Sequence, residues 1–246
     1  MTSLEVCHCV SDPWFSAVLN RAVYRLVECT ALEGSGNAPA TMVPWERCSQ
    51  ESPVFIYATI PSSDVKASAR LGQRGFYCAE SRLVFEKQRQ PERFPVPDTF
   101  TIRYAIPADE QEVRRIARCS FSYSRFHCDP RFSRVEADAV KEAWAANFFT
   151  GGRGTHMIVA VSHDTCIGFL QLCAQHDVLT IDLIAVAPEH RHHGIADAMI
   201  AYAERTCSGH ARIRVGTQAA NIPSVRLYER LGFRLVASYY VLHYHN

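Results

Sequence analysis

The sequence lacks a long apolar run, and it also lacks an excess of charge of either sign. No stretch of about 18 apolar residues occurs, which argues against a transmembrane helix. Residues 1–10 contain Glu5 and have neither a basic start nor an apolar centre, so we expect no signal peptide. The formal net charge of +1 gives no broad basic surface for nucleic acid or an anionic membrane. We therefore expect a cytoplasmic protein that binds neither.

The sequence also lacks the regular cysteine spacing of disulfide-rich or zinc-binding proteins. Its ten cysteines are scattered along the chain, and we expect them to be free, buried thiols. Cys7-His8-Cys9 and the histidines at 190, 192 and 193 have neither the C-x-x-C nor the H-x-x-x-H spacing of a zinc site. The histidines are better explained as positive charge near a phosphate or as solvated side chains. We therefore expect no metal ion.

The composition is that of an ordinary globular enzyme. The chain has 246 residues, of which 48% are hydrophobic and 21% charged, enough for one large or two small cores. Prolines and charges interrupt every regular period between Glu92 and Asp98. We therefore predict two domains, residues 1–97 and residues 98–246.

The most informative segment is residues 179–201, where a strand runs through a short loop into a helix. Side chains alternate along residues 180–187, whereas apolar residues recur at helical spacing from Ile195 onward. The loop therefore ends at a helix N-terminus, where free backbone N–H groups and the helix dipole favour an anion. Gly194 lets a ligand approach the backbone closely. This pattern predicts a pyrophosphate site.

The same segment resembles the acetyl-CoA-binding motif R-x-x-G-x-A of the GCN5-related N-acetyltransferases (GNAT), which are acyltransferases. Residues 221–233 resemble the second motif of that family. The elements expected after residue 98 follow the order β-α-α-β-β-β-α-β-α-β, which fits the GNAT fold. The resemblance implies an α/β (α+β) fold with a mixed, mostly antiparallel sheet flanked by helices, and acetyl-CoA as cosubstrate.

The resemblance also implies roles for particular residues. Tyr228 corresponds to the general acid that protonates the CoA thiolate, although a core tyrosine is the alternative because Ile222 and Val225 share its helix face. Asn221 corresponds to a residue beside the lower arm of the cofactor, although it could serve only as a helix cap. The pyrophosphate would contact Arg191, His192, His193, Gly194, Ile195 and Ala196.

The main chain of Ile184, Ala185 and Val186 would lie along the pantetheine arm in this fold. A backbone N–H there could stabilise the oxyanion, provided that the neighbouring strand splays away. No motif identifies a general base. Asp182, His176 and Asp177 remain candidates, and the amine of an amino sugar, being partly neutral near neutral pH, does not require one.

A faint internal repeat links the two predicted domains. Residues 54–85 align without gaps on residues 211–242, with five identities and the same order of strand, helix, Gly-Phe and strand. No R-x-x-G-x-A turn occurs before residue 98, and Leu71 stands where the second copy has Tyr228. We therefore expect residues 1–97 to form a degenerate half-GNAT domain without catalytic parts.

Three features together resemble the dTDP-fucosamine N-acetyltransferases: residues 121–127, residues 214–218 ahead of Asn221, and the degenerate N-terminal half. Residues 127–135 depart from that pattern. The resemblance implies acetylation of the C4 amine of a dTDP-linked amino-deoxy sugar for surface polysaccharide, and a homodimer. The residues expected to contact the acceptor are Tyr123, Arg125, Phe126 and Asp182.

Two other functions stay open on the sequence alone. The same fold could act on another amine, such as a protein N-terminus, a polyamine or an aminoglycoside. The chain could also be a catalytically silent acyl-CoA-binding module, since its N-terminal half already resembles a decayed copy. The basic balance of residues 120–135 disfavours a cationic acceptor, and the complete turn and Tyr228 disfavour a silent module.

Overall fold

The computed structural model describes residues 5–31, 42–90 and 99–246, which form two compact units. One unit comprises the described residues up to Ser81 together with Cys128–Arg131 and Ser238–Asn246. The other comprises the described residues of Arg82–His127 and Phe132–Ala237. Each unit is therefore discontinuous in sequence. The predicted domain boundary near residues 92–98 lies outside the described residues.

The first unit contains a mixed sheet with strand order β3-β1-β2-β4-β11. Strand β4 pairs parallel with β2 and antiparallel with β11, whose last residues also belong to this unit. Its core includes Cys9, Trp45, Ile56 and Leu71. Its elements are β1 (Glu5–Ser11), α1 (Pro13–Leu19), β2 (Ala22–Ala31), β3 (Met42–Pro44), α2 (Trp45–Cys48), β4 (Val54–Pro61) and α3 (Val65–Gln73), with parts of β5 (Tyr77–Gln88) and β11 (Arg234–His245).

The second unit contains a sheet with strand order β5-β10-β9-β8-β7-β6. Among the described strand pairs of this sheet, only β9–β10 is parallel, as the GNAT order implies. Its elements are β6 (Thr101–Tyr104), α4 (Glu110–Ser120), α5 (Arg125–Cys128), α6 (Arg134–Ala146), β7 (His156–Ser162), β8 (Thr165–Gln175), β9 (Val178–Val186), α7 (Ile195–Thr206), β10 (Arg212–Gln218) and α8 (Ile222–Arg230).

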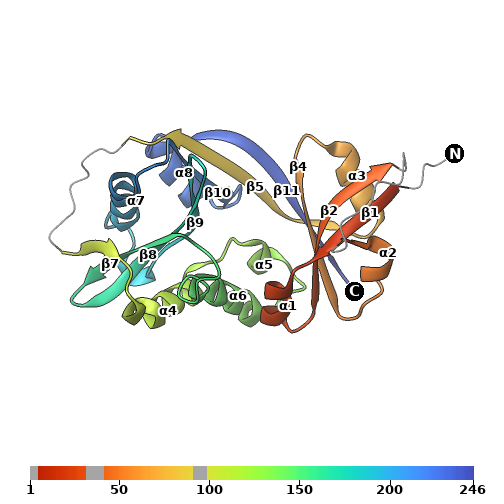
Figure 1. Ribbon diagram of the computed structural model, residues 1–246, viewed down its shortest axis with the longest axis horizontal. Helices are drawn as coiled ribbons and strands as arrows, with labels where there is room; N and C mark the ends of the chain where they lie inside the picture. The colour runs from red at the N-terminus through yellow and green to blue at the C-terminus, as the bar shows by residue number, and fades with distance from the viewer. Residues whose placement is uncertain (1–4, 32–41, 91–98) are drawn as a thin grey trace. The chain divides into compact units, whose positions relative to one another are not determined.

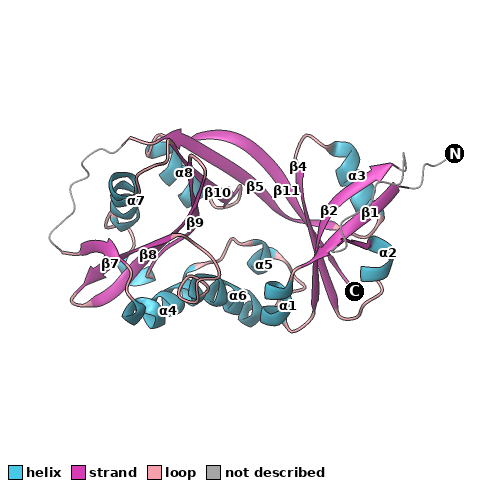
Figure 2. Cartoon of the chain, viewed as in Figure 1, coloured by secondary structure: helices cyan, strands magenta, loops and turns pink. Residues whose placement is uncertain are grey.

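Helices cover both faces of this second sheet (Figures 1 and 2). Successive residues of β7 point to opposite faces, so Met157 and Val159 pack with α4 and α6, whereas Ile158 and Ala160 pack with α7. Each face is thus a separate apolar cluster. The α7 and α8 side carries the segments that the sequence assigns to cofactor binding.

The repeat noticed in the sequence has the same elements in both copies. Strand β4, helix α3 and strand β5 correspond to β10, α8 and β11, and both helices have nine residues. Asp64 caps α3 by accepting a hydrogen bond from the Ala67 N–H (2.9 Å), and Asn221 caps α8 by accepting one from Ser224 (3.3 Å). Equivalent local signals therefore start the two helices.

The expectation that all cysteines are free and buried is wrong. Cys7 is disulfide-bonded, a bond that the spacing of the cysteines in the sequence does not reveal. Cys78, Cys119 and Cys128 are free but exposed. Buried free thiols do occur, for example at Cys9, in the core of the first unit.

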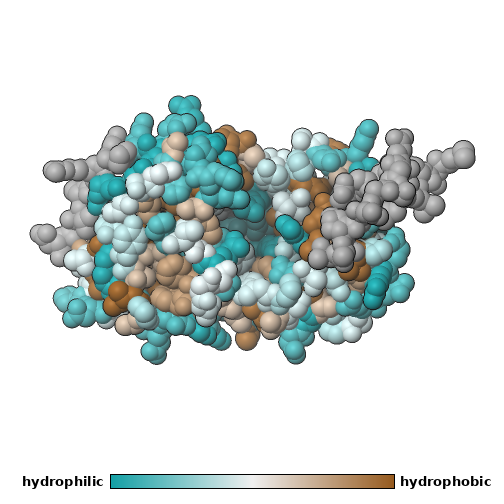
Figure 3. All heavy atoms as spheres, viewed as in Figure 1, coloured by the Kyte–Doolittle hydropathy of each residue, from teal (hydrophilic) through white to brown (hydrophobic). Residues whose placement is uncertain are grey.

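The molecular face shown in Figure 3 is mostly hydrophilic or neutral, with smaller hydrophobic patches between. Within the described part of the chain, no helix has the length and apolar character needed to cross a bilayer.

Candidate active site

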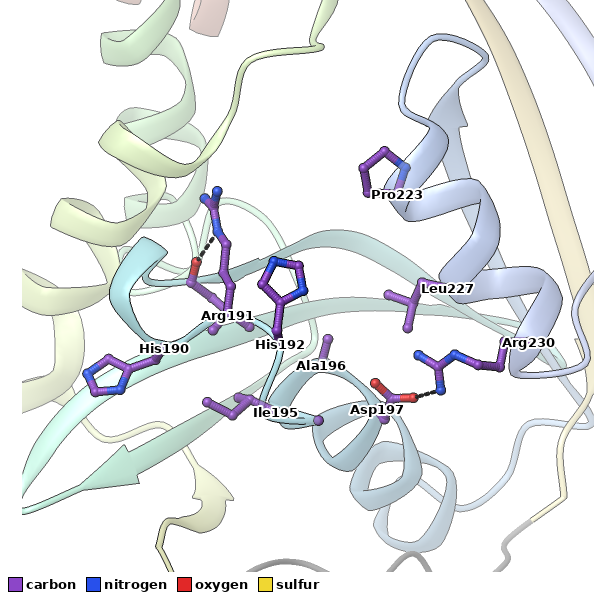
Figure 4. A pocket seen from close by; sticks show the side chains of 11 residues that line it. His190, Arg191, His192, Ile195, Ala196, Asp197, Pro223, Leu227 and Arg230 are labelled. Atoms are coloured by element: carbon purple, nitrogen blue, oxygen red, sulfur yellow. Dashed lines mark hydrogen bonds and ion pairs between the residues drawn. The ribbon is translucent and has the colours of Figure 1, made fainter.

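A pocket of about 500 Å³ lies in the second unit between the N-terminus of α7 and one side of α8. Figure 4 shows the histidines and arginine of the turn before α7 on one side of this pocket and side chains of α8 on the other. The lining residues are Val186, His190, Arg191, His192, Gly194, Ile195, Ala196, Asp197, Pro223, Leu227 and Arg230. The structure therefore brings five of the six predicted pyrophosphate residues into one pocket, and His193 does not line it.

The turn before α7 has the conformation of an anion cradle. Gly194 is the N-cap of α7 with φ +74°, and no side chain caps the first amides of this helix. A Cβ atom at Gly194 would have no neighbour within 4 Å apart from the adjacent residues, so the space beside this residue is open. His192 also has a positive φ of +67°, which turns the chain sharply into the helix. Uncapped amides facing open space suit a pyrophosphate.

Arg191 fixes the turn to the rest of the unit. Its Nε donates to the carbonyl oxygen of Val186 (3.2 Å), and its Nη2 donates to that of Ser120 (3.2 Å). The guanidinium thus joins the end of β9, the end of α4 and the turn. Its positive charge remains beside the helix N-terminus, where it adds to the attraction for an anion.

An ion pair that sequence analysis missed joins α7 to α8. Asp197, in the first turn of α7, is buried, and its carboxylate accepts a hydrogen bond from the Arg230 guanidinium (Figure 4). The bond raises the pKa of Arg230. The two residues are 33 positions apart, so no local pattern could have paired them. The pair holds the two walls of the pocket together.

The strand that carries the predicted oxyanion donors does splay from its neighbour. Parallel pairing of β9 with β10 covers only Val178 to Ile181. Pairing of β9 with β8 on its other edge continues to Val186. Main-chain groups of β9 after Ile181 that face β10 therefore have no partner in that strand. A backbone N–H among residues 184–186 could act as an oxyanion donor only if the neighbouring strand separates from β9 there, and β10 does so. Val186 lines the pocket.

Tyr228 follows the pocket-lining Leu227 on α8, and it does not line the pocket itself. It is 3% exposed, with its ring packed against Phe85 and Phe233. Burial raises the pKa of its hydroxyl above the ordinary value, so the phenol keeps its proton at neutral pH. No hydrogen bond to this hydroxyl occurs among residues 5–31, 42–90 and 99–246 as described. Asn221 does act as the α8 cap.

The Asp182 carboxylate is held in a network of hydrogen bonds. It accepts from the Trp144 Nε1 (2.9 Å), from Arg153 at both oxygens (2.7 and 2.6 Å) and from the Gln171 side chain (3.3 Å). Asp177 is likewise paired, with Arg212 (3.1 Å). The geometry therefore favours a structural role for both carboxylates.

The segment predicted to contact the acceptor contains one buried and two more accessible side chains. Phe126 is 1% exposed and packs edge-to-face on Phe132, whereas Tyr123 is 40% exposed and Arg125 is half-buried. Arg125 lies over the Phe126 ring at 4.7 Å from its centre. Of the three, Tyr123 and Arg125 are thus the side chains that a ligand could reach.

A buried hydrogen-bonded chain fixes this segment to α6. The Ser124 hydroxyl lies 2.6 Å from Nδ1 of His127, and Nε2 of His127 lies 2.9 Å from the Asp138 carboxylate. Burial lowers the pKa of His127, while the hydrogen bond to Asp138 opposes that shift. The neutral imidazole can bridge the hydroxyl and the carboxylate.

Comparison with known proteins agrees with this fold. A profile of the Acetyltransferase (GNAT) family matches residues 111–233. The spore coat polysaccharide biosynthesis protein SpsD of Bacillus subtilis (strain 168) is 30% identical over 236 residues, which is 94% of this chain and 80% of that protein.

Solved structures show the same fold. A GCN5-related N-acetyltransferase from Sphaerobacter thermophilus has a TM-score of 0.55 at 20% identity, covering 78% of this chain and 60% of that one. A tandem GNAT protein from the clavulanic acid biosynthesis pathway has a TM-score of 0.60 at 14% identity, covering 91% of this chain and 75% of that one. The α+β GNAT fold is confirmed, and the chain belongs to the GNAT family of acetyltransferase enzymes.

Proposed function

We infer that this enzyme transfers an acetyl group from acetyl-CoA to the amine, at C4, of a nucleotide-linked amino-deoxy sugar, with dTDP as the nucleotide. The observation that carries the acetyl-CoA half is the uncapped, open N-terminus of α7 beside the splayed edge of β9. The sugar half draws support from the resemblance in residues 121–127 and from a relative named for spore coat polysaccharide biosynthesis.

The pocket residues suit the parts of acetyl-CoA in order. The amides at the start of α7 and the charge of Arg191 would hold the pyrophosphate. The edge of β9 left open after Ile181 would pair with the amides of the pantetheine arm. The thioester would then lie where α8 approaches β9, with Asn221 at the start of that helix. The cofactor is thereby aimed by main-chain groups rather than by replaceable side chains.

The reaction is direct attack of a neutral amine on the thioester carbonyl. The amine forms the new C–N bond as the carbonyl oxygen becomes an oxyanion, which a backbone N–H among Ile184, Ala185 and Val186 would stabilise. Collapse breaks the C–S bond, and Tyr228 would donate its proton to the CoA thiolate. The amine proton leaves through water. A proton from water then restores the Tyr228 phenol, and CoA leaves as the free thiol.

The acceptor side favours an anionic ligand. Arg125 could pair with the diphosphate of a nucleotide sugar, and the exposed ring of Tyr123 could stack on its base. Asp182 is engaged by Trp144 and Arg153, so we do not assign it as a general base. An amino-sugar amine needs none, since part of it is already neutral near neutral pH. The homodimer stays a prediction.

Thiol release from acetyl-CoA tests the proposal. The purified chain is assayed with dTDP- and UDP-linked 4-amino sugars, with polyamines and aminoglycosides, and with peptide N-termini. Acceptor-dependent release with the nucleotide sugars alone supports the proposal. Release with simple amines contradicts the proposal and favours a GNAT enzyme that acts on another amine. CoA binding without turnover for any acceptor also contradicts it and favours a catalytically silent acyl-CoA-binding module.

A further inference from the structure

A second cluster of chemically active side chains lies within the first unit, apart from the pocket residues. Asp129, His243 and His245 bring one carboxylate and two imidazoles together, with a donor atom of each within 4.8 Å of the others. His243 and His245 share one face of β11, because side chains alternate along a strand. Asp129 comes from Cys128–Arg131, which belongs to this unit although both its flanking segments belong to the other.

Both oxygens of Asp129 are fixed in direction. Its Oδ1 accepts hydrogen bonds from the Tyr77 hydroxyl (2.7 Å) and from the Arg131 N–H (2.8 Å). Its Oδ2 lies 2.6 Å from Nδ1 of His243 and 3.1 Å from Nε2 of His245. One oxygen is therefore oriented by outer partners, while the other faces both imidazoles. Metal-binding carboxylates are typically oriented in this way by a second layer of hydrogen bonds.

The cluster is enclosed by the protein. The side chains of Asp129 and His243 are 0% exposed and that of His245 is 6% exposed. The Phe55 ring packs edge-on to His243 and stacked on His245, at 4.7 and 4.9 Å between ring centres. Burying a carboxylate is costly unless positive charge or hydrogen bonds offset it. A metal cation bound between the three groups would supply such positive charge.

We propose that Asp129, His243 and His245 bind one divalent transition-metal ion of the zinc type. Imidazole nitrogen and carboxylate oxygen are ligands that zinc takes in proteins. With metal–ligand distances of about 2.0 to 2.1 Å, tetrahedral ligands lie about 3.3 Å apart. The two imidazoles thus need to withdraw from Asp129 by less than about 1 Å to admit the ion. A fourth position remains for water.

Such an ion would tie the Cys128–Arg131 segment to the end of β11. Sequence spacing could not reveal it, because Asp129 and His243 are 114 residues apart. The local spacings around Cys7 and His190, on which we expect no metal ion, do not include the residues of this cluster. The site contains no residue of the proposed acetyl-transfer pocket, so its presence does not depend on that function.

Calorimetric titration with zinc chloride tests the proposal on the full chain after removal of metal by a chelator. The expected result is one zinc per chain and a rise in the thermal unfolding midpoint. Asp129→Asn and His245→Gln should each weaken zinc binding at least tenfold. His163→Gln, in the exposed turn between β7 and β8, is the matched control and should leave binding unchanged. Absence of stoichiometric binding overturns the proposal.

A second measurement covers the case in which Asp129→Asn fails to fold. Cobalt is bound to the unaltered chain, and X-ray absorption reads the ligand types. Two imidazoles with oxygen ligands support the site. Sulfur ligands from the cysteines, or binding that His192→Gln abolishes, would place the ion elsewhere and overturn the proposal.

Discussion

Replacing Tyr228 by phenylalanine separates a chemical role from a packing role, because it removes only the hydroxyl. The ring would keep its contacts with Phe85 and Phe233, at 6.2 and 5.6 Å between ring centres. The hydroxyl has no hydrogen-bond partner in the described part of the chain. The free energy of unfolding should therefore change by less than about 1 kcal/mol.

The expected loss lies in turnover. A positioned general acid commonly contributes about 10²- to 10⁴-fold. We predict that Tyr228→Phe lowers kcat more than about tenfold, which corresponds to more than about 1.4 kcal/mol in the activation free energy. The affinity for acetyl-CoA should stay within about twofold, since the pocket residues that bind it are unchanged. Thiol release gives kcat, and calorimetry gives the affinity.

The pH profile adds an independent check. Burial raises the pKa of Tyr228, so its proton stays on as pH rises through the ordinary phenol value of about 10. The unaltered enzyme should then show no alkaline loss of activity from this group below that pH. Tyr202→Phe, on α7 and outside the pocket, is the control. An unchanged kcat in Tyr228→Phe would refute the acid role and leave a core tyrosine.

Three further substitutions probe the pocket and the candidate base Asp182. Gly194→Val should weaken acetyl-CoA binding, measured by calorimetry, at least tenfold, because a β-branched residue is strained at φ +74° and fills the open space. Gly209→Val, at φ +86° and outside the pocket, is the control for backbone strain. Arg230→Ala leaves the buried Asp197 carboxylate without this ion-pair partner. Thermal unfolding should show that the free energy of unfolding falls by about 1 kcal/mol. Asp182→Asn should cost about 1 to 3 kcal/mol in denaturant unfolding yet leave the pH profile of kcat unshifted; a lost acid limb would make Asp182 the base.

Much of the fold could be predicted from the local periodicity of the sequence. The change from alternation to helical spacing before Ile195 located β9, the turn and α7, because these signals depend on residues close together in the chain. The N-caps Asp64 and Asn221 are likewise local, and they start equivalent helices in the two repeated segments. The short helix α5 was not predicted, since four residues show no period.

Contacts between distant residues could not be predicted in the same way. The Asp197–Arg230 pair, the disulfide of Cys7 and the Asp129 cluster each depend on strand register or helix packing. The engagement of Asp182 also depends on packing, since its partners come from α6, β8 and the loop before β7. The sequence therefore located the turn that we propose binds an anion, and only the structure showed which residues surround it.

The central claim is that the amides at the start of α7 bind the pyrophosphate of acetyl-CoA. A crystal structure of the CoA complex tests it most directly. We predict pyrophosphate oxygens within about 2.7 to 3.2 Å of backbone nitrogens between His192 and Asp197. A diphosphate bound at another place, with these amides facing only water, would contradict it.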